Sequence, residues 1–265
     1  MNAVLLGEGW QVMGGLAIGV YALFKAVSWR IAGRPAADWR KPAYLFAWPG
    51  MDAAQFASPC ARVQQPSWNE WSFAVAKLGL GLGLVLWLAP VVPPSQPLLA
   101  GWVGMIGCVL ALHFGLFHVL SCLWRSLGRG AAPLMDWPIA ARSVAEFWGR
   151  RWNRAFRDLA HRLLFRPLEP ALGARGALFV GFLASGLIHE LVISLPAGAG
   201  YGGPTLYFLL QALGIAVERQ RRWKEGPWRR AFTALVVLGP VGLLFHQPFV
   251  LQVFVPLLQA LGVRP

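Results

Sequence analysis

Residues 177–195 read ALFVGFLASGLIHELVISL, nineteen residues whose only ionisable side chains are His189 and Glu190. A helix needs about 20 apolar residues to cross a hydrocarbon core of about 30 Å, so this stretch predicts a transmembrane helix. An ionisable group inside such a helix is expensive and usually faces a cavity or a partner. The same stretch therefore indicates the class of fold and supplies candidate functional groups.

The rest of the chain has the same character. Of its 265 residues 57% are hydrophobic and 13% are charged, whereas a soluble domain carries about 25% charged residues. This composition excludes a water-soluble enzyme, and 14 Trp and 16 Phe exclude a disordered chain. The other apolar stretches are Trp10–Trp29, Phe73–Val92, Leu98–Trp124, Pro204–Val217 and Phe232–Val263.

The last stretch, residues 232–263, would be about 48 Å long as one helix, which is too long for one crossing. We expect it to break at His246-Gln-Pro248. The chain is therefore predicted to be an all-α, polytopic membrane protein with about six to seven transmembrane helices, forming a single membrane-embedded domain over residues 1–265.

The charge distribution predicts an orientation. The net charge is +13, and the basic residues gather in loops 30–72, 125–176 and 218–230, while loops 93–97 and 196–203 carry no charge. Under the positive-inside rule the basic loops are cytoplasmic and the amino terminus is outside. Attraction to anionic lipid headgroups explains the excess charge better than nucleic acid does.

No metal site is expected. Cys60, Cys108 and Cys122 are scattered and contain no CxxC pair. His189-Glu190 lacks the second histidine of a zinc protease, because Ile193 stands where that motif requires it. His113, His118 and His246 are expected to form local hydrogen bonds.

The segment from Glu146 to Phe165 shows two helical faces. One is apolar and the other basic, which predicts an amphipathic helix at the cytoplasmic interface. Ser143 with Glu146 predicts a capping box at its start. The alternative is that this helix only anchors the chain at the membrane surface. Anchoring does not require the amide of Asn153, however, and an amide is a good hydrogen-bond donor to a developing oxyanion. The apolar face comprises Trp148, Trp152, Phe156, Leu159 and Leu163, and the basic face comprises Arg150, Arg154, Arg157 and His161.

Ser185 and His189 are four residues apart and share a helical face, which the small residue Gly181 extends. This arrangement leaves room beside the imidazole for a substrate chain or another helix. A neutral histidine can act as a general base near pH 7. The alternative is a buried histidine that is hydrogen-bonded between helices.

Residues 133–220 resemble the wax-synthase-like branch of the membrane-bound O-acyltransferases. The resemblance rests on Asp136-Trp-Pro138, Ser143, Glu146-Phe-Trp-Gly-Arg-Arg-Trp-Asn153, Ser185-Gly-Leu-Ile-His189-Glu190 and the stretch from Tyr207-Phe-Leu-Leu-Gln-Ala-Leu-Gly214 to Glu218.

The resemblance implies a helical bundle around a tunnel, where a cytoplasmic acyl-CoA meets a lipophilic alcohol from the bilayer. It implies that His189 and Asn153 are catalytic. No bound cofactor or metal is required, and acyl-CoA is a co-substrate. The residues expected to bind substrate are Trp148, Arg150, Arg151, Trp152, Arg154, Ser185 and Glu190.

Two alternatives remain open at this point. In the first, the protein is an O-acyltransferase whose acceptor is the hydroxyl of a sterol, terpenoid, diacylglycerol or sugar. In the second, the chain is a non-catalytic membrane scaffold or a proton-coupled carrier. In each case the protein is expected to be an integral, multi-pass membrane protein, in the plasma or inner membrane of a bacterium or the endoplasmic reticulum of a eukaryote. The sequence does not indicate an oligomeric state.

Overall fold

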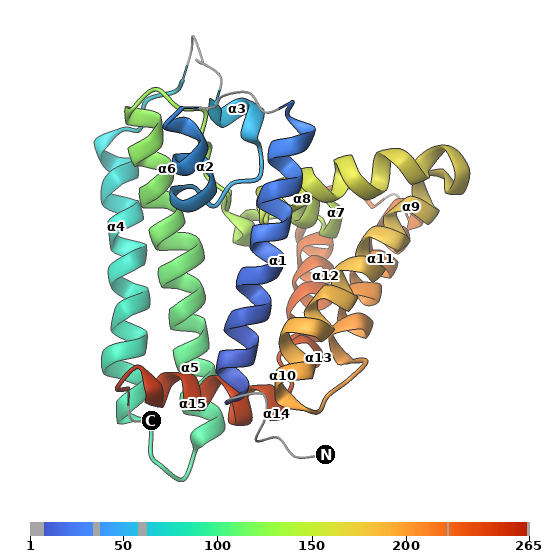
Figure 1. The fold of residues 1–265 in the computed structure, drawn as a ribbon. Coiled ribbons are helices and arrows are strands. Elements are labelled where there is room, and N and C mark those ends of the chain that lie inside the picture. The colour runs from blue at the N-terminus through green and yellow to red at the C-terminus, as the bar shows by residue number, and fades with distance from the viewer. Residues whose placement is uncertain (1–7, 34–37, 58–62, 222, 264–265) are drawn as a thin grey trace. The chain divides into compact units, whose positions relative to one another are not determined.

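The computed structural model describes residues 8–33, 38–57, 63–221 and 223–263. Every regular element in these ranges is a helix (Figure 1), which confirms the predicted all-α class. Cys60 lies outside the described residues. The α-helices are α1 (Gly9–Ile31), α2 (Arg40–Ala47), α3 (Ala53–Ala57), α4 (Trp68–Gly83), α5 (Pro97–Val109), α6 (Phe117–Ser126), α7 (Val144–Glu146), α8 (Arg154–Ala160), α9 (Arg166–His189), α10 (Leu195–Ala197), α11 (Gly203–Arg221), α12 (Pro227–Leu238), α13 (Val241–Leu244), α14 (Gln247–Phe249) and α15 (Val255–Ala260).

Short helical stretches of other types join several of these helices. The π-helical stretches are η2 (Leu84–Leu88), η4 (Leu110–Leu116), η6 (Phe147–Arg151), η7 (His161–Phe165), η8 (Glu190–Ser194) and η9 (Val250–Phe254). The 3₁₀ turns are η3 (Ala89–Val91) and η5 (Pro138–Ala140).

The helices pack into two compact units. The first contains the described parts of Met1–Ile18, Trp137–Trp152 and Ala160–Leu261. The second contains those of Gly19–Asp136, Asn153–Leu159 and Gly262–Pro265. A single membrane-embedded domain over residues 1–265 stays a prediction.

Four helical segments of the described chain are long and apolar enough to cross a membrane, and a bent pair would make a fifth. The predicted number of six to seven is not confirmed. The stretch 204–217 forms α11, which is not among these segments, because the helix continues into Glu218, Arg219 and Arg221. The four segments are Gly9–Ile31, Trp68–Val91, Pro97–Ser126 and Arg154–Ala197, and the bent pair is Pro227–Leu244 with Gln247–Ala260.

The fourth segment is broken at Gly173. Its 44 residues would extend about 66 Å as a straight helix, about twice the hydrocarbon thickness. Gly173 has φ +66 and ψ 167 inside α9, a conformation that glycine adopts without a steric penalty. The helix changes direction here (Figure 1), and the predicted span 177–195 lies on the carboxyl-terminal side of the break.

The last apolar stretch breaks where the sequence predicts. The helices on either side of His246 differ in direction by 58°. His246 is extended, and its Nδ1 accepts a hydrogen bond of 3.2 Å from the Phe249 N–H. The imidazole therefore caps α14, which confirms both the break and the local role expected of His246.

The second unit buries the amine of Lys25, which comes from α1. Lys25 is 2% exposed, its Nζ donates to the Gly50 carbonyl at 2.7 Å, and it lies 3.3 Å from the centroid of the Tyr44 ring. The carbonyl and the aromatic face compensate part of the cost of burying this polar group. Lys25 thus joins α1 to the segment around α2.

Candidate functional site

His189 is the last residue of α9, and its own helix fixes the orientation of its ring. Nδ1 lies 2.7 Å from the carbonyl oxygen of Ser185. Because a carbonyl only accepts, Nδ1 carries the proton, and the neutral ring has its lone pair on Nε2. The shared face of Ser185 and His189 is confirmed. The Ser185 hydroxyl donates to the Gly181 carbonyl at 3.0 Å, so its proton is engaged within the helix.

An aromatic chain connects His189 to residues 144–152 of the first unit, which comprise α7, η6 and Trp152 and are called the tryptophan motif below. The His189 ring lies 4.5 Å from the Phe208 ring, measured between centroids. Phe208 in turn lies 5.6 Å from Trp148, and Trp148 packs edge-on against Phe182 at 5.7 Å. The imidazole therefore sits in apolar surroundings, and α9 and α11 lie side by side here (Figure 1).

Gln211 holds Trp148 in place. Its Oε1 accepts a bond of 3.2 Å from Trp148 Nε1, and its Nε2 donates to the Val236 carbonyl at 2.8 Å. The side chain is fully buried, so both ends of the amide have a partner where water is excluded. The sequence analysis includes Gln211 in the matched stretch 207–218 but gives it no role, although an amide within the apolar stretch 204–217 is a usable signal.

Ser143 caps α7, as predicted. Its Oγ accepts the Glu146 N–H at 2.9 Å. In a capping box the glutamate side chain also accepts a hydrogen bond from the backbone N–H of the capping residue. Here the Glu146 carboxylate accepts instead from the Arg142 backbone N–H, at 2.9 Å. Burial raises the pKa of Glu146, but hydrogen bonds from Arg142 and Arg151 outweigh this effect and hold the pKa below its usual value.

Glu218 of α11 is a second residue that sequence reasoning did not assign to the site. Its carboxylate is 5% exposed and accepts the backbone N–H groups of Val144 at 2.9 Å and Ala145 at 3.3 Å. The first N–H groups of a helix have no partner within that helix. Glu218 therefore anchors the start of the tryptophan motif to α11.

The prediction of one amphipathic helix over residues 146–165 is wrong. Trp152 is extended, with φ −97 and ψ 130, and Asn153 has φ +39, in the left-handed region. Asparagine tolerates this region because its side chain bonds locally. Its Oδ1 accepts the Phe156 N–H at 3.2 Å, which caps α8 and leaves the amide N–H groups for another acceptor.

This break divides the predicted apolar face between the units. Trp148 and Trp152 pack with buried Phe147 in the first unit. Phe156 packs against Phe24 of α1 at 5.5 Å in the second unit. Asn153 also belongs to the second unit and His189 to the first, so their pairing at a tunnel stays a prediction.

The three arginines expected to bind substrate have different surroundings. Arg150 is exposed. Arg151 donates to Glu146 Oε1 from Nε at 2.8 Å and to the Trp137 carbonyl at 3.3 Å, so its charge is engaged. Arg154 is half-buried in the second unit, where its backbone N–H donates to the Leu134 carbonyl at 3.0 Å.

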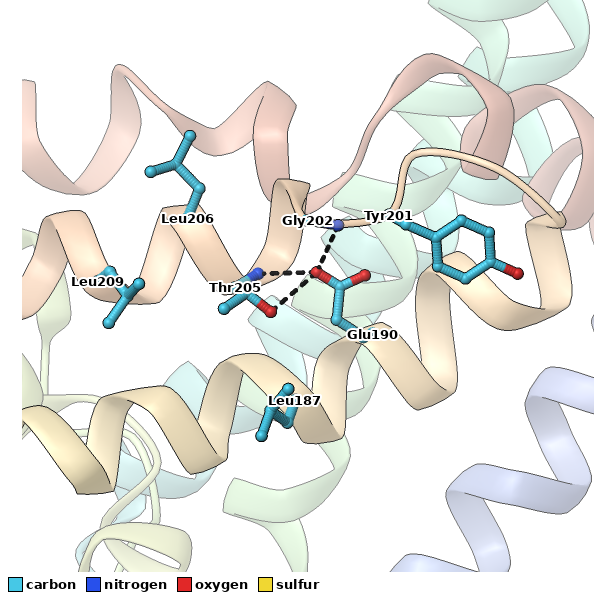
Figure 2. Close-up of a pocket in the computed structure, with 7 residues that line it drawn as sticks. All are labelled: Leu187, Glu190, Tyr201, Gly202, Thr205, Leu206 and Leu209. Carbon is cyan, nitrogen blue, oxygen red and sulfur yellow. Dashed lines mark hydrogen bonds between the residues drawn. The ribbon is translucent and has the colours of Figure 1, made fainter.

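Glu190 begins η8 and points toward the start of α11 (Figure 2). Its Oε1 accepts three hydrogen bonds, from the Gly202 N–H at 3.0 Å, the Thr205 N–H at 3.0 Å and the Thr205 hydroxyl at 2.9 Å. Three donors to one oxygen are typical of an ionised carboxylate. Glu190 thus fixes the turn between α10 and α11.

Ser194 and His246 lie 3.3 Å apart in the first unit, between Oγ and Nε2. This pair does not act as a nucleophile and its base. Nδ1 of His246 accepts from Phe249, so the proton of the neutral ring is on Nε2 and points at the serine oxygen. The contact is structural.

In the second unit, Glu70, His118 and Cys122 place their possible ligand atoms within 4.8 Å of one another. The guanidinium of Arg125 forms a salt bridge with Glu70 and lies 3.7 Å from the Cys122 sulfur. Lys77 Nζ lies 2.7 Å from His118 Nδ1. Two cations therefore occupy the positions beside these groups, and the expectation that no metal is required stays a prediction.

Comparison with known proteins places this geometry in a family. The family model described as "Membrane bound O-acyl transferase family" matches residues 131–210, which include both the tryptophan motif and His189. The chain is 30% identical over 210 residues to probable long-chain-alcohol O-fatty-acyltransferase 9 of Arabidopsis thaliana, which is 70% of this chain and 60% of that protein.

Two further relatives carry similar names. Probable long-chain-alcohol O-fatty-acyltransferase 1 of Arabidopsis thaliana is 32% identical over 196 residues, or 69% of this chain and 57% of that protein. The long-chain-alcohol O-fatty-acyltransferase of Simmondsia chinensis is 31% identical over 102 residues, or 35% and 29%. This chain thus spans between 29% and 60% of the lengths of these relatives. With the motif residues gathered on α7, η6, α9 and α11, these matches show that the chain belongs to the wax-synthase-like branch of the membrane-bound O-acyltransferase family.

Proposed function

We propose that this protein is a membrane O-acyltransferase that moves a fatty acyl group from acyl-CoA to the hydroxyl of a long-chain alcohol. The observation that carries the proposal is the hydrogen bond from His189 Nδ1 to the Ser185 carbonyl. It leaves the lone pair of the neutral ring on Nε2, in an apolar span beside Phe208. The names of the relatives supply the reaction class.

The chemistry is direct acyl transfer. Nε2 of His189 takes the proton of the alcohol as its oxygen attacks the thioester carbonyl. The tetrahedral intermediate collapses, the carbon–sulfur bond breaks, and the thiolate of coenzyme A receives the proton from the imidazolium. The ester and the free thiol are the products, and no metal or bound cofactor takes part.

Asn153 supports the oxyanion in this scheme. Its Oδ1 is engaged as the cap of α8, so the group that remains for the substrate is the amide N–H, the donor that a developing oxyanion needs. The left-handed backbone at Asn153 is a conformation that few other side chains tolerate. These features support a role beyond anchoring.

The donor is proposed to bind at the basic end of the motif. Arg150 is the exposed arginine of the three and suits the phosphates of coenzyme A. Arg151 contributes by holding Glu146, and Arg154 lies beyond the break at Asn153. Trp148, Trp152 and Ser185 are proposed to shape the acyl site.

The membrane setting follows from the apolar helices and the charge pattern. We place the basic loops on the cytoplasmic side, in a multi-pass protein of the plasma or inner membrane or of the endoplasmic reticulum. Water is excluded from the apolar surroundings of His189, which protects the thioester from hydrolysis.

The test is release of free thiol by the purified protein from a long-chain acyl-CoA, with a panel of alcohols. We expect release that depends on a long-chain alcohol and yields the matching ester. Release with a sterol, diacylglycerol or sugar alone would replace the proposed acceptor. No release with any acceptor would overturn the enzymatic proposal in favour of a scaffold or carrier.

A further inference from the structure

The helix that leads into the span 177–195 is largely uncovered in the first unit. Residues 161–172 form one helical run through η7 and the start of α9, and the chain turns back at Gly173 (Figure 1). From Arg166 to Arg175 every residue except Leu168 is exposed, and the chain is buried again at Ala177. Residues 161–175 are called the arm below, and its surface is open to a partner.

The arm has two faces of different character. Leu164, Leu168 and Leu172 follow one another at intervals of four residues, which places them along one side of the helix. Leu164 and Leu168 are half-buried, and Leu172 is 50% exposed. Arg166 and Glu169 lie on the opposite side and are exposed. An apolar stripe opposite a charged face is typical of a helix that lies in a membrane interface.

The turn at Gly173 places the arm at the membrane boundary. Ala177, the first residue of the predicted span, follows four residues later, which is about 6 Å along a helix. The helical run of residues 161–172 is about 18 Å long and too short to cross a hydrocarbon core of about 30 Å. An exposed leucine face that ends so close to a span therefore lies between lipid and water, where acyl chains cover it.

The charges of the arm select the kind of lipid. Arg162, Arg166 and Arg175 carry three positive charges against the one negative charge of Glu169. Under the positive-inside rule this loop is cytoplasmic, and the anionic lipids of the cytoplasmic leaflet attract arginines at its surface. A soluble anion would meet the arginines but leave the leucines in water. An anionic phospholipid meets both faces, because its acyl chains contact the leucines while its phosphate contacts the arginines.

We propose that the arm is a binding surface for anionic phospholipids of the cytoplasmic leaflet. The leucine face lies among the acyl chains, and Arg166 and Arg175 contact the phosphates. The proposal goes beyond acyl transfer and does not depend on it, because it concerns a lipid that is not a substrate. The arm continues through Gly173 into the helix that ends at His189, so a lipid bound here also fixes where that helix begins in the membrane.

The first test measures the depth of the arm. A spin label is attached to Ala171→Cys or to Glu169→Cys of the full chain, in a cysteine-free background and in nanodiscs that contain phosphatidylglycerol. Both positions are exposed, and Ala171 lies on the leucine side of the helix. We expect oxygen to relax the label at 171 and a water-soluble nickel chelate to relax the label at 169. Equal access of the nickel chelate to both labels would place the arm in water and overturn the proposal.

The second test measures the choice of lipid, without any acyl donor. Photoreactive phosphatidylglycerol and phosphatidylcholine are compared by their yield on peptides that contain Leu168 and Leu172. We expect a preference for phosphatidylglycerol that high salt weakens. Arg166→Gln and Arg175→Gln should each reduce this preference about 5-fold.

Two matched variants separate charge from structure at the same positions. Arg166→Lys with Arg175→Lys should keep the preference, because the attraction depends on charge, and Glu169→Gln should increase it by removing a repulsive charge. An unchanged preference in the two glutamine variants of arginine, or a reduced preference in Glu169→Gln, would overturn the lipid site. Loss of labelling when free coenzyme A is added would overturn it too and assign the arginines to the acyl donor.

Discussion

Replacing His189 by glutamine isolates the proton-transfer role. The amide N–H of glutamine can donate to the Ser185 carbonyl, as Nδ1 does at 2.7 Å, but no lone pair of comparable basicity replaces Nε2. We therefore expect a fall in kcat of about 10²- to 10⁴-fold, the usual contribution of a general base. The free energy of unfolding should change by less than about 1 kcal/mol, because the helix-bound hydrogen bond is retained.

His189→Ala extends the test. It removes both the bond to Ser185 and the contact with Phe208, so a loss of about 1–2 kcal/mol of stability is expected beside the loss of activity. The assay is ester formation per folded molecule, with folding followed by thermal unfolding in detergent. If imidazole added to the buffer restores part of the turnover of the alanine variant, the missing group is the base.

The matched control is His246→Ala. That imidazole caps α14 and contacts Ser194, so its loss should lower stability by about 1 kcal/mol and leave turnover per folded molecule near the wild-type value. Near-normal turnover in His189→Gln would refute the reasoning and make His189 a packing residue. An equal loss of turnover in both histidine variants would do the same.

Four further predictions follow from individual contacts. Asn153→Asp keeps the cap oxygen and the tolerance of positive φ but removes the N–H donor, so kcat should fall about 10²- to 10³-fold with little change in Tm; unchanged turnover would assign Asn153 to capping alone. Arg150→Gln should raise the KM for acyl-CoA more than that for the alcohol, whereas Arg151→Gln should mainly lower Tm because it unpairs Glu146; the reverse pattern would contradict the assignment. Because the pKa of Glu146 is lowered in the folded state, its ionised carboxylate stabilises the fold above the pKa of the unfolded carboxyl, and this stabilisation is lost as the pH falls through the folded-state pKa. Glu146→Gln should therefore have a lower Tm than the wild type at pH 7, and the difference should vanish in acid. A difference that does not depend on pH would exclude the charge as its cause. Tyr201→Cys, which is 61% exposed in the wild type, should react with an impermeant thiol reagent from outside the cell in a cysteine-free background, and labelling only after permeabilisation would invert the topology.

Local patterns in the sequence were sufficient to predict several features of the structure. The apolar stretches place the first three candidate spans, because hydrophobic length alone decides whether a helix can cross the bilayer. The break at His246, the Ser143 cap and the shared face of Ser185 and His189 follow equally from residues a few positions apart. In each case the interacting groups belong to the same turn or helix, so periodicity suffices to bring them together.

Features that depend on contacts between residues far apart in the sequence were decided only by the tertiary structure. A period of 3.6 residues continues through Trp152 and Asn153, yet the chain breaks there, because Trp152 packs with Phe147 while Phe156 packs against Phe24 of a helix more than a hundred residues earlier. The roles of Gln211 and Glu218, which bond to the tryptophan motif more than sixty residues away, depend in the same way on which helix faces meet. The sequence alone determined where the long apolar helices lie and which polar groups lie among apolar residues. Only packing between helices determined which partners those groups have, because the partners come from distant parts of the chain.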